Sequence, residues 1–88
     1  MTTELQSSIT VKIESFGAIE RQLPQHLTVQ CQADSLVADV LHKVVQSFPE
    51  AYNLIERCAC AIGEDIISRQ TKLNRDSTLV LLSPVAGG

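Results

Sequence analysis

The sequence has few aromatic residues and few basic ones. It contains no tryptophan, one tyrosine and two phenylalanines, and seven Lys and Arg residues are outnumbered by ten Asp and Glu, giving a net charge of −3. The basic residues are scattered instead of forming a stripe. Binding of nucleic acids depends on clustered Lys and Arg and on aromatic platforms for the bases. We therefore expect no nucleic-acid partner.

The sequence also lacks a long apolar run. No stretch is long enough to span a bilayer, and residues 1–8 are polar, unlike a secretory signal. The three cysteines are an odd number, which fits free thiols in a reducing compartment better than a disulfide framework. These features predict a cytoplasmic protein that does not bind a membrane.

Motifs typical of enzymes are missing as well. The chain has no phosphate-binding loop, nucleophile elbow or dinucleotide fingerprint, and its carboxylates show no paired arrangement. The spacing of Cys58 and Cys60 does not match a zinc knuckle, and His26 and His42 stand apart without a ligand pattern. We interpret the two cysteines as buried structural residues, with metal binding or redox chemistry as the alternative. We expect no metal site.

The first half of the chain predicts two strands separated by an ambiguous segment. Ile9, Val11 and Ile13 alternate with polar residues, which is the period of a strand with one buried face. A second short strand follows at residues 27–31. Residues 18–24 between them fit either a short helical turn or the arm of a hairpin.

The strongest periodic signal lies between residues 37 and 48 and predicts an amphipathic helix. Asp34 or Ser35 offers an N-cap oxygen, and Pro49 ends the helix. Each buried apolar side chain contributes roughly 1.5–3 kcal/mol before entropy is subtracted, so this helix should fill most of the core. The apolar positions at spacings of three and four are Val37, Val40, Leu41, Val44, Val45 and Phe48.

The second half of the chain predicts more strands and completes the fold. Residues 50–57 fit a short helix or a structured loop, residues 58–62, 66–68 and 78–82 fit strands, and Leu73 lies in a polar connection. One helix across one mixed sheet is an α+β arrangement, and pairing of the last strand beside the first gives the β-grasp topology. We predict a ubiquitin-like β-grasp domain over residues 1–83, with residues 1–7 as a loose lead-in, one main helix and a mixed sheet of four to five strands.

Residues 84–88 predict a flexible C-terminal tail. Pro84 directs the chain away from the sheet, Val85 and Ala86 follow, and Gly87 and Gly88 lack a Cβ and can pass through a narrow channel. We expect a free α-carboxylate on Gly88, which can attack the α-phosphate of ATP in another protein's site and then accept sulfur. A frayed terminus without a function is the alternative.

The last strand is apolar on both faces. Leu79 and Leu81 face one side, and Val80 and Leu82 face the other. One main helix covers one face only, so we favour a partner protein over a fully covered strand. Residues 66–67 repeat this pattern, with one residue inward and its neighbour outward. Together these residues predict an exposed apolar patch beside the tail.

With these features in place, the sequence resembles the small subunits of molybdopterin synthase over residues 9–88. The most specific part is the ending, where an apolar strand runs into Ser83-Pro84-Val85-Ala86-Gly87-Gly88 and the family has Pro-Pro-Val-x-Gly-Gly. Ser83 therefore replaces the first proline, which predicts a less stiff root of the tail, and residues 74–77 replace an Asp-Gly-Asp turn. Supporting stretches are Phe16-Gly17-Ala18-Ile19-Glu20, Cys60-Ala61-Ile62-Gly63-Glu64, Ile66-Ile67-Ser68-Arg69 and Leu73.

The resemblance implies a function as a sulfur carrier that binds no cofactor itself. An adenylating enzyme would activate Gly88 with ATP and magnesium, and a sulfurtransferase system would convert the carboxylate to a thiocarboxylate. The loaded tail would enter the large subunit of a heterotetrameric molybdopterin synthase, which supplies the active-site side chains, and would donate sulfur to precursor Z for the molybdenum cofactor. By position, Phe16, Ile66 and Leu82 match the docking residues of the family, and Val80 shares the outward face of Leu82.

Three other functions remain open. A sulfur carrier for thiazole synthesis in the thiamine pathway would use the same chemistry, although Pro84 favours the molybdopterin pathway. A ubiquitin-like modifier would attach its terminal glycine to lysine side chains of target proteins. A binding module with an inert tail would use neither reaction.

Overall fold

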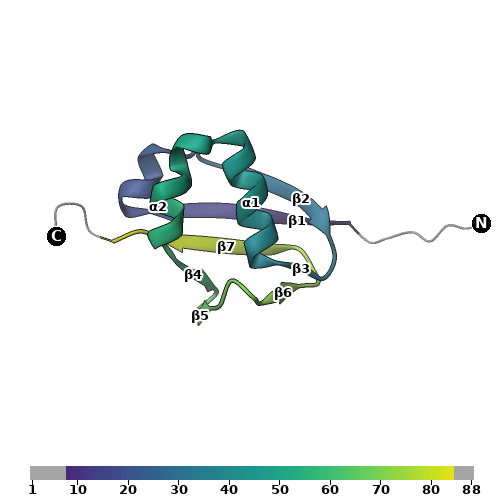
Figure 1. The fold of residues 1–88 in the computed structure, drawn as a ribbon. Helices are drawn as coiled ribbons and strands as arrows, with labels where there is room; N and C mark the ends of the chain where they lie inside the picture. Colours follow the sequence, from purple (N-terminus) through teal and green to yellow (C-terminus); the bar gives the residue numbers. More distant parts are fainter. Residues whose placement is uncertain (1–7, 85–88) are drawn as a thin grey trace, which may run out of the picture.

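The computed structural model describes residues 8–84. These residues form a mixed five-stranded sheet with helices packed on it (Figure 1). The strands lie in the order β2-β1-β7-β4-β5, with β1 and β7 parallel at the centre and the other neighbours antiparallel. This arrangement confirms the predicted β-grasp fold. The bounds are β1 Ser8–Phe16, β2 Leu27–Gln32, β4 Ala59–Ile62, β5 Asp65–Ile67 and β7 Ser77–Leu82.

A short helical turn connects the first two strands. Ile9, Val11 and Ile13 are buried in β1, as their alternation predicts. The connection begins with the 3-10 helix η1 (Gly17–Arg21), which settles the open choice for residues 18–24. Ile19 is fully buried and fixes the turn to the core.

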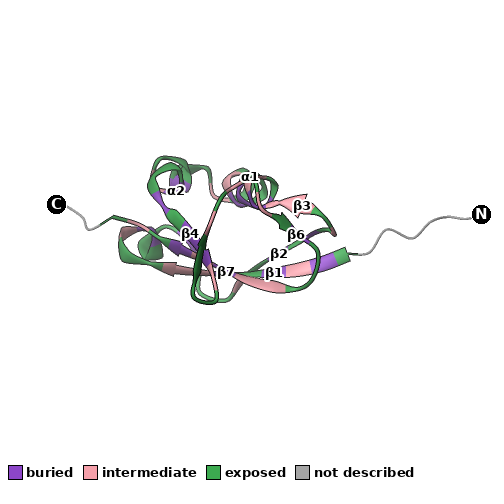
Figure 2. Ribbon diagram, turned by 90° about the horizontal axis from the view of Figure 1, so that it is seen from below, coloured by how far each residue is buried: buried purple, intermediate pink, exposed green. Residues whose placement is uncertain are grey.

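Two helices lie on the same face of the sheet (Figures 1 and 2). The predicted amphipathic helix is α1 (Val37–Ser47), and the 3-10 helix η2 (Pro49–Ala51) begins at the proline expected to end it. Residues 50–57, which fitted a helix or a loop, contain α2 (Tyr52–Arg57). Within residues 8–84, no helix is long and apolar enough to cross a membrane. The buried residues of α1 are Val37, Val40, Leu41 and Val44.

The N-terminus of α1 differs from the prediction. Asp34 lies in a turn with a positive φ of 71°, and the Ser35 hydroxyl donates a hydrogen bond to the carbonyl oxygen of Gln32 (2.7 Å). Neither side chain caps the helix, so the predicted N-cap is wrong. Leu36 is the N-cap residue, and its N–H donates to the Asp39 carboxylate (3.0 Å).

Backbone carbonyls from a distant connection take the place of the predicted cap. The Val37 N–H donates to the carbonyl oxygen of Thr71, and the Ala38 N–H donates to that of Arg69, both at 2.9 Å. The first N–H groups of a helix have no partner within the helix, so these two bonds satisfy donors that a side-chain cap would otherwise serve.

The same connection forms a small second sheet that sequence reasoning missed. The two-residue strands β3 (Ser35–Leu36) and β6 (Lys72–Leu73) pair antiparallel. Leu73, expected in a polar connection, is buried, and its carbonyl oxygen accepts a hydrogen bond from the Asp34 N–H (2.7 Å). Two-residue strands carry no detectable periodicity, and this explains why the pattern did not indicate them.

The hydrophobic core lies between the helices and the face of the sheet that they cover (Figure 2). Among the described residues, no polar or charged side chain is buried. Cys31, Cys58 and Cys60 are buried and form no disulfide, which confirms the interpretation of Cys58 and Cys60 as buried residues. The side chains that fill the core are therefore apolar or thiol groups.

Candidate functional site

Strand register gathers distant apolar residues on the outer face of the sheet. Phe16 of β1 lies beside Leu82 of β7, which lies beside Ala59 of β4. In the next row, Val80 lies beside Ala61, which lies beside Ile66 of β5. Because side chains alternate along a strand, these residues face away from the helices. We call this set the apolar patch: Phe16, Ala59, Ala61, Ile66, Val80 and Leu82.

The large side chains of the patch are open to solvent. Phe16 is 47% exposed, Ile66 is 68% exposed and Leu82 is 36% exposed, while Val80 is half-buried. All four docking residues predicted from the sequence therefore lie on one surface. A contiguous apolar surface of this kind on a small protein is typical of an interaction site.

The two-faced pattern of the last strand is confirmed. Leu79 and Leu81 are fully buried under the helices, whereas Val80 and Leu82 lie on the patch. In β5, Ile67 packs against the core and Ile66 is exposed. The apolar surface results from alternation along β7 and β5, since the helices cover only one face.

The patch ends abruptly toward the N-terminal end of β1. Glu14 lies beside Val80 in the register, and Lys12 lies beside Thr78 two residues further along. The outer face of the sheet is thus apolar at the end where β7 stops and polar at the other end. A partner that binds the apolar half lies next to the start of the tail.

Ser83 joins the end of β7 to the end of β1. Its N–H donates a hydrogen bond to the carbonyl oxygen of Phe16 (3.0 Å), and its hydroxyl donates to the same oxygen (2.9 Å). The hydroxyl also accepts a hydrogen bond from the N–H of Ile19 (3.0 Å). The sequence predicted a less stiff tail root at Ser83, but these contacts hold the residue in place.

Only the first residue of the predicted tail is described. Pro84 is exposed and follows Ser83 directly. Residues 85–88, including the Gly88 carboxylate, lie outside the described residues, so the chemistry assigned to Gly88 stays a prediction.

The Arg69 side chain forms hydrogen bonds within the domain that the sequence analysis did not predict. Its guanidinium donates hydrogen bonds to the carbonyl oxygens of Ile55 (2.6 Å) and Cys58 (3.0 Å), where α2 ends and β4 begins. A positive charge at this position stabilises the negative end of the helix dipole. The sequence placed Arg69 in one of the stretches that support the resemblance, but gave no signal for these hydrogen bonds.

The cysteines near Arg69 are poorly suited to chemistry. Burial raises the pKa of the Cys58 thiol and of the Cys60 thiol, and Arg69 opposes this only in part. The Cys58 thiol donates to the carbonyl oxygen of Leu54 (3.2 Å). A thiol must lose its proton to become a nucleophile or a metal ligand, so a raised pKa makes both groups weaker nucleophiles and metal ligands near neutral pH than an ordinary cysteine. Among residues 8–84, no group of three or more His, Cys, Asp or Glu residues could hold a metal ion.

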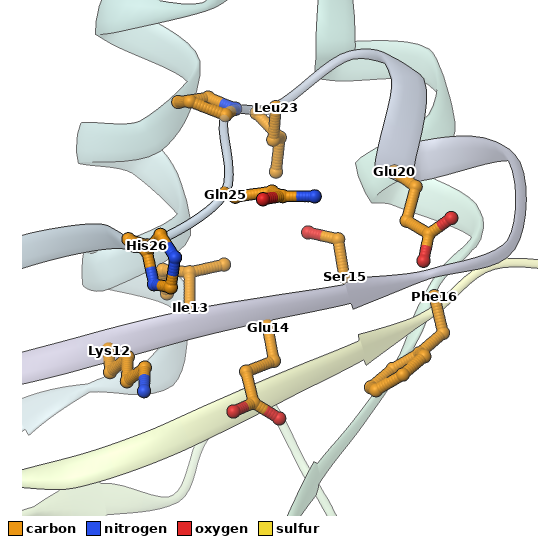
Figure 3. Close-up of a pocket in the computed structure, with 10 residues that line it drawn as sticks. Lys12, Ile13, Glu14, Ser15, Phe16, Glu20, Leu23, Gln25 and His26 are labelled. Carbon is orange, nitrogen blue, oxygen red and sulfur yellow. The ribbon is translucent and has the colours of Figure 1, made fainter.

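A pocket of about 420 Å³ lies beside the patch, where β2 no longer pairs with β1 (Figure 3). Lys12, Glu14 and Phe16 project from one side of β1, and Gln25 and His26 come from the connection that precedes β2. Its lining mixes both charge signs with polar and apolar groups, which does not favour one class of ligand. The pocket shares Phe16 with the patch but adds no reactive group to it.

Comparison with known proteins gives a family match and several structural matches. The sequence model of the ThiS family matches residues 16–88. No curated protein matches the chain. The family match includes the patch, Ser83 and the whole predicted tail.

Structures from two organisms show the same fold. SAMP1 from Haloferax volcanii superposes with a TM-score of 0.78 at 16% sequence identity, covering 90% of this chain and 99% of that chain. The HVO 2177 protein of the same organism gives a TM-score of 0.77 at 14% identity, covering 100% and 94%. A chain of the complex of subunits 1 and 2 of molybdopterin-converting factor from Helicobacter pylori 26695 gives a TM-score of 0.61 at 25% identity, covering 91% and 100%.

Proposed function

The chain belongs to the ThiS family, and on that premise we propose that it is a sulfur carrier whose terminal residue, Gly88, is the small subunit's sulfur donor in molybdopterin synthase. The match to a chain of the molybdopterin-converting factor complex, at 25% identity over 91% of the chain, supports this assignment. The resemblance of residues 79–88 to the C-terminal sequence of molybdopterin synthase small subunits also supports it.

The observation that carries the proposal is the apolar patch at the root of the tail. Leu82 is the last residue of β7, and the tail begins two residues later at Pro84. A carrier without catalytic side chains has to be recognised by the proteins that load and unload it. A surface that ends where the tail begins allows each partner to bind the body and receive the tail together.

In the proposed reaction, the partners supply the catalytic groups. The Gly88 carboxylate attacks the α-phosphate of ATP in a magnesium-dependent adenylating enzyme, and pyrophosphate leaves. A sulfur nucleophile then displaces AMP to give the thiocarboxylate. The large subunit of the synthase receives the loaded tail, and sulfur is transferred to precursor Z. The residues of this chain bind the partners and orient the tail.

A modifier function is the second candidate. Three of the structures with the same fold come from Haloferax volcanii, and one of them is named small archaeal modifier protein 1. A modifier would share the adenylation step but transfer its glycine carbonyl to a lysine amine instead of accepting sulfur. A carrier for thiazole synthesis would share the thiocarboxylate and differ only in the acceptor.

The proposal places the chain in the cytoplasm, in a heterotetramer with the large subunit. Three free buried cysteines support a reducing compartment. The patch supports binding of the large subunit, because it offers an apolar surface to a larger protein.

The test is to supply the purified chain with the adenylating enzyme, ATP, magnesium and a sulfurtransferase. We expect intact-protein mass spectrometry to show the exchange of one oxygen for sulfur at Gly88. Addition of the large subunit and precursor Z should then restore the carboxylate and form molybdopterin. A variant extended by one residue beyond Gly88 is the control and should stay unmodified.

Three results would contradict the proposal in different ways. A wild-type chain that keeps its carboxylate excludes a sulfur carrier. A thiocarboxylate that persists with the large subunit and precursor Z excludes the molybdopterin pathway. Covalent attachment to lysine in place of thiocarboxylate formation favours the modifier.

A further inference from the structure

The end of β7 is held by a connected set of hydrogen bonds. The carbonyl oxygen of Phe16 accepts two of them, from the N–H and the hydroxyl of Ser83, and its two lone pairs allow both. The Ser83 hydroxyl in turn accepts the N–H of Ile19. These bonds join residues 64 to 67 positions apart in sequence. The last residue before the proline is therefore bonded to the turn that follows β1.

Gly17 provides the space for this contact. Its φ of +87° lies in the left-handed region, which glycine adopts without strain. A Cβ at this position would lie 2.5 Å from the Ser83 hydroxyl oxygen and 2.9 Å from the Ser83 carbonyl oxygen. The turn at Gly17 and the side chain at Ser83 therefore fit each other as a pair.

Phe16 belongs to both the docking surface and this hydrogen-bonded group. Its side chain is on the apolar patch, and its carbonyl oxygen holds Ser83. A partner that binds the Phe16 ring thus contacts a residue that is bonded directly to the tail root. Pro84 also restricts Ser83 to extended backbone angles, because its ring disfavours helical ones in the residue before it.

We propose that Ser83 is a positioning residue that couples the apolar patch to the direction of the tail. The inference rests on the proposed function, since it concerns delivery of Gly88 to a partner's active site. Ser83 touches neither ATP nor the reacting carboxylate in this scheme. It acts by restricting the directions in which the chain leaves the body after the patch has bound.

Positioning of this kind affects the reaction rate more than it affects binding. A misplacement of about 1 Å of a reacting group can lower a rate by roughly a hundredfold. Removal of the Ser83 hydroxyl deletes two of the three bonds and leaves the patch intact. The expected result is a lower kcat for adenylation, while the affinity of the partner for the body stays the same.

The experiment compares the wild-type chain with Ser83→Ala, Ser83→Thr and Ser77→Ala. Each is adenylated by the same activating enzyme, and the reaction is followed as pyrophosphate release. Ser77 is the matched control, because it lies at the other end of β7 and its hydroxyl also donates to a backbone carbonyl (Arg75, 2.8 Å). We expect kcat to fall by roughly tenfold or more in Ser83→Ala. The KM of the activating enzyme for this variant, and the Kd of their complex without ATP, should stay within twofold of the wild-type values. Thr keeps a hydroxyl and should restore kcat.

The outcomes separate this inference from the proposed function. A wild-type chain that is not adenylated contradicts the proposed function and the inference with it. Adenylation of the wild type with an unchanged kcat in Ser83→Ala contradicts the positioning role alone. A rise in KM and Kd with an unchanged kcat assigns Ser83 to docking and also overturns the inference. A cooperative thermal unfolding transition in each of the three variants shows that it is folded.

Discussion

At the scale of single residues, two glycines at positive φ differ in what surrounds them. Gly17 has a φ of +87° and lies against Ser83, whereas Gly63 has a φ of +61° and a Cβ there would have no atom within 4 Å. At both positions, a residue with a Cβ would have a strained left-handed backbone, which costs about 1–2 kcal/mol. Only Gly17 adds a steric conflict with a residue distant in sequence.

This difference gives a matched test of the contact between Gly17 and Ser83. We expect Gly63→Ala to lower the free energy of unfolding by about 1–2 kcal/mol and Gly17→Ala to lower it by more, through backbone strain plus overlap with Ser83. Unfolding in urea measures both. In a Ser83→Ala background the hydroxyl is absent, so the cost of Gly17→Ala should decrease. Effects that add to within about 0.5 kcal/mol would show that the two residues are not coupled.

At the scale of elements, the connection between β5 and β7 forms contacts with α1, β3 and α2 that its sequence did not indicate. It supplies carbonyl oxygens to the first N–H groups of α1, a paired strand in β6 and the guanidinium at the end of α2. The sequence predicted α1 well, because its apolar spacing is set by residues within the helix. It did not predict how α1 begins, because Thr71 and Arg69 act through backbone oxygens, which any residue type has.

Arg69 is the part of this connection that mutation can test. Hydrogen bonds to charged groups contribute about 1.5–3 kcal/mol, and Arg69 is partly exposed, so Arg69→Ala should cost about 1–3 kcal/mol of stability. Denaturation in urea measures this, and Arg75→Ala, at an exposed position in the next turn, is the control. Equal stability of the two variants would show that the bonds to Ile55 and Cys58 contribute nothing measurable.

At the scale of the whole molecule, one physical pattern produced both the fold and the surface. Alternation in β7 predicted that Leu79 and Leu81 face one side and Val80 and Leu82 the other; the structure confirms this and buries the first pair in the core. The sequence could not give the register that sets Phe16 beside Leu82, which depends on the parallel pairing of the first and last strands. Nor could it show that Ser83 is held by hydrogen bonds to Phe16 and Ile19.

The division of the outer sheet face into an apolar half and a polar half gives the last prediction. Leu82 and Thr78 point from the same face of β7, but Leu82 is on the patch and Thr78 lies beside Lys12. We expect Leu82→Asp to weaken binding of the large subunit by roughly tenfold or more, because the substitution removes apolar contact area and puts an unpaired carboxylate, which resists burial, into the interface. Thr78→Asp should leave Kd within about threefold of wild type.

Calorimetric titration measures both affinities, and thermal unfolding shows whether each variant keeps its fold. Leu82 is exposed and its neighbour Leu81 fills the core, so Leu82→Asp should unfold near the wild-type temperature. Loss of the fold in Leu82→Asp would assign Leu82 to the core instead of the interface. Equal weakening by both variants would show that added negative charge, and not the apolar patch, governs binding.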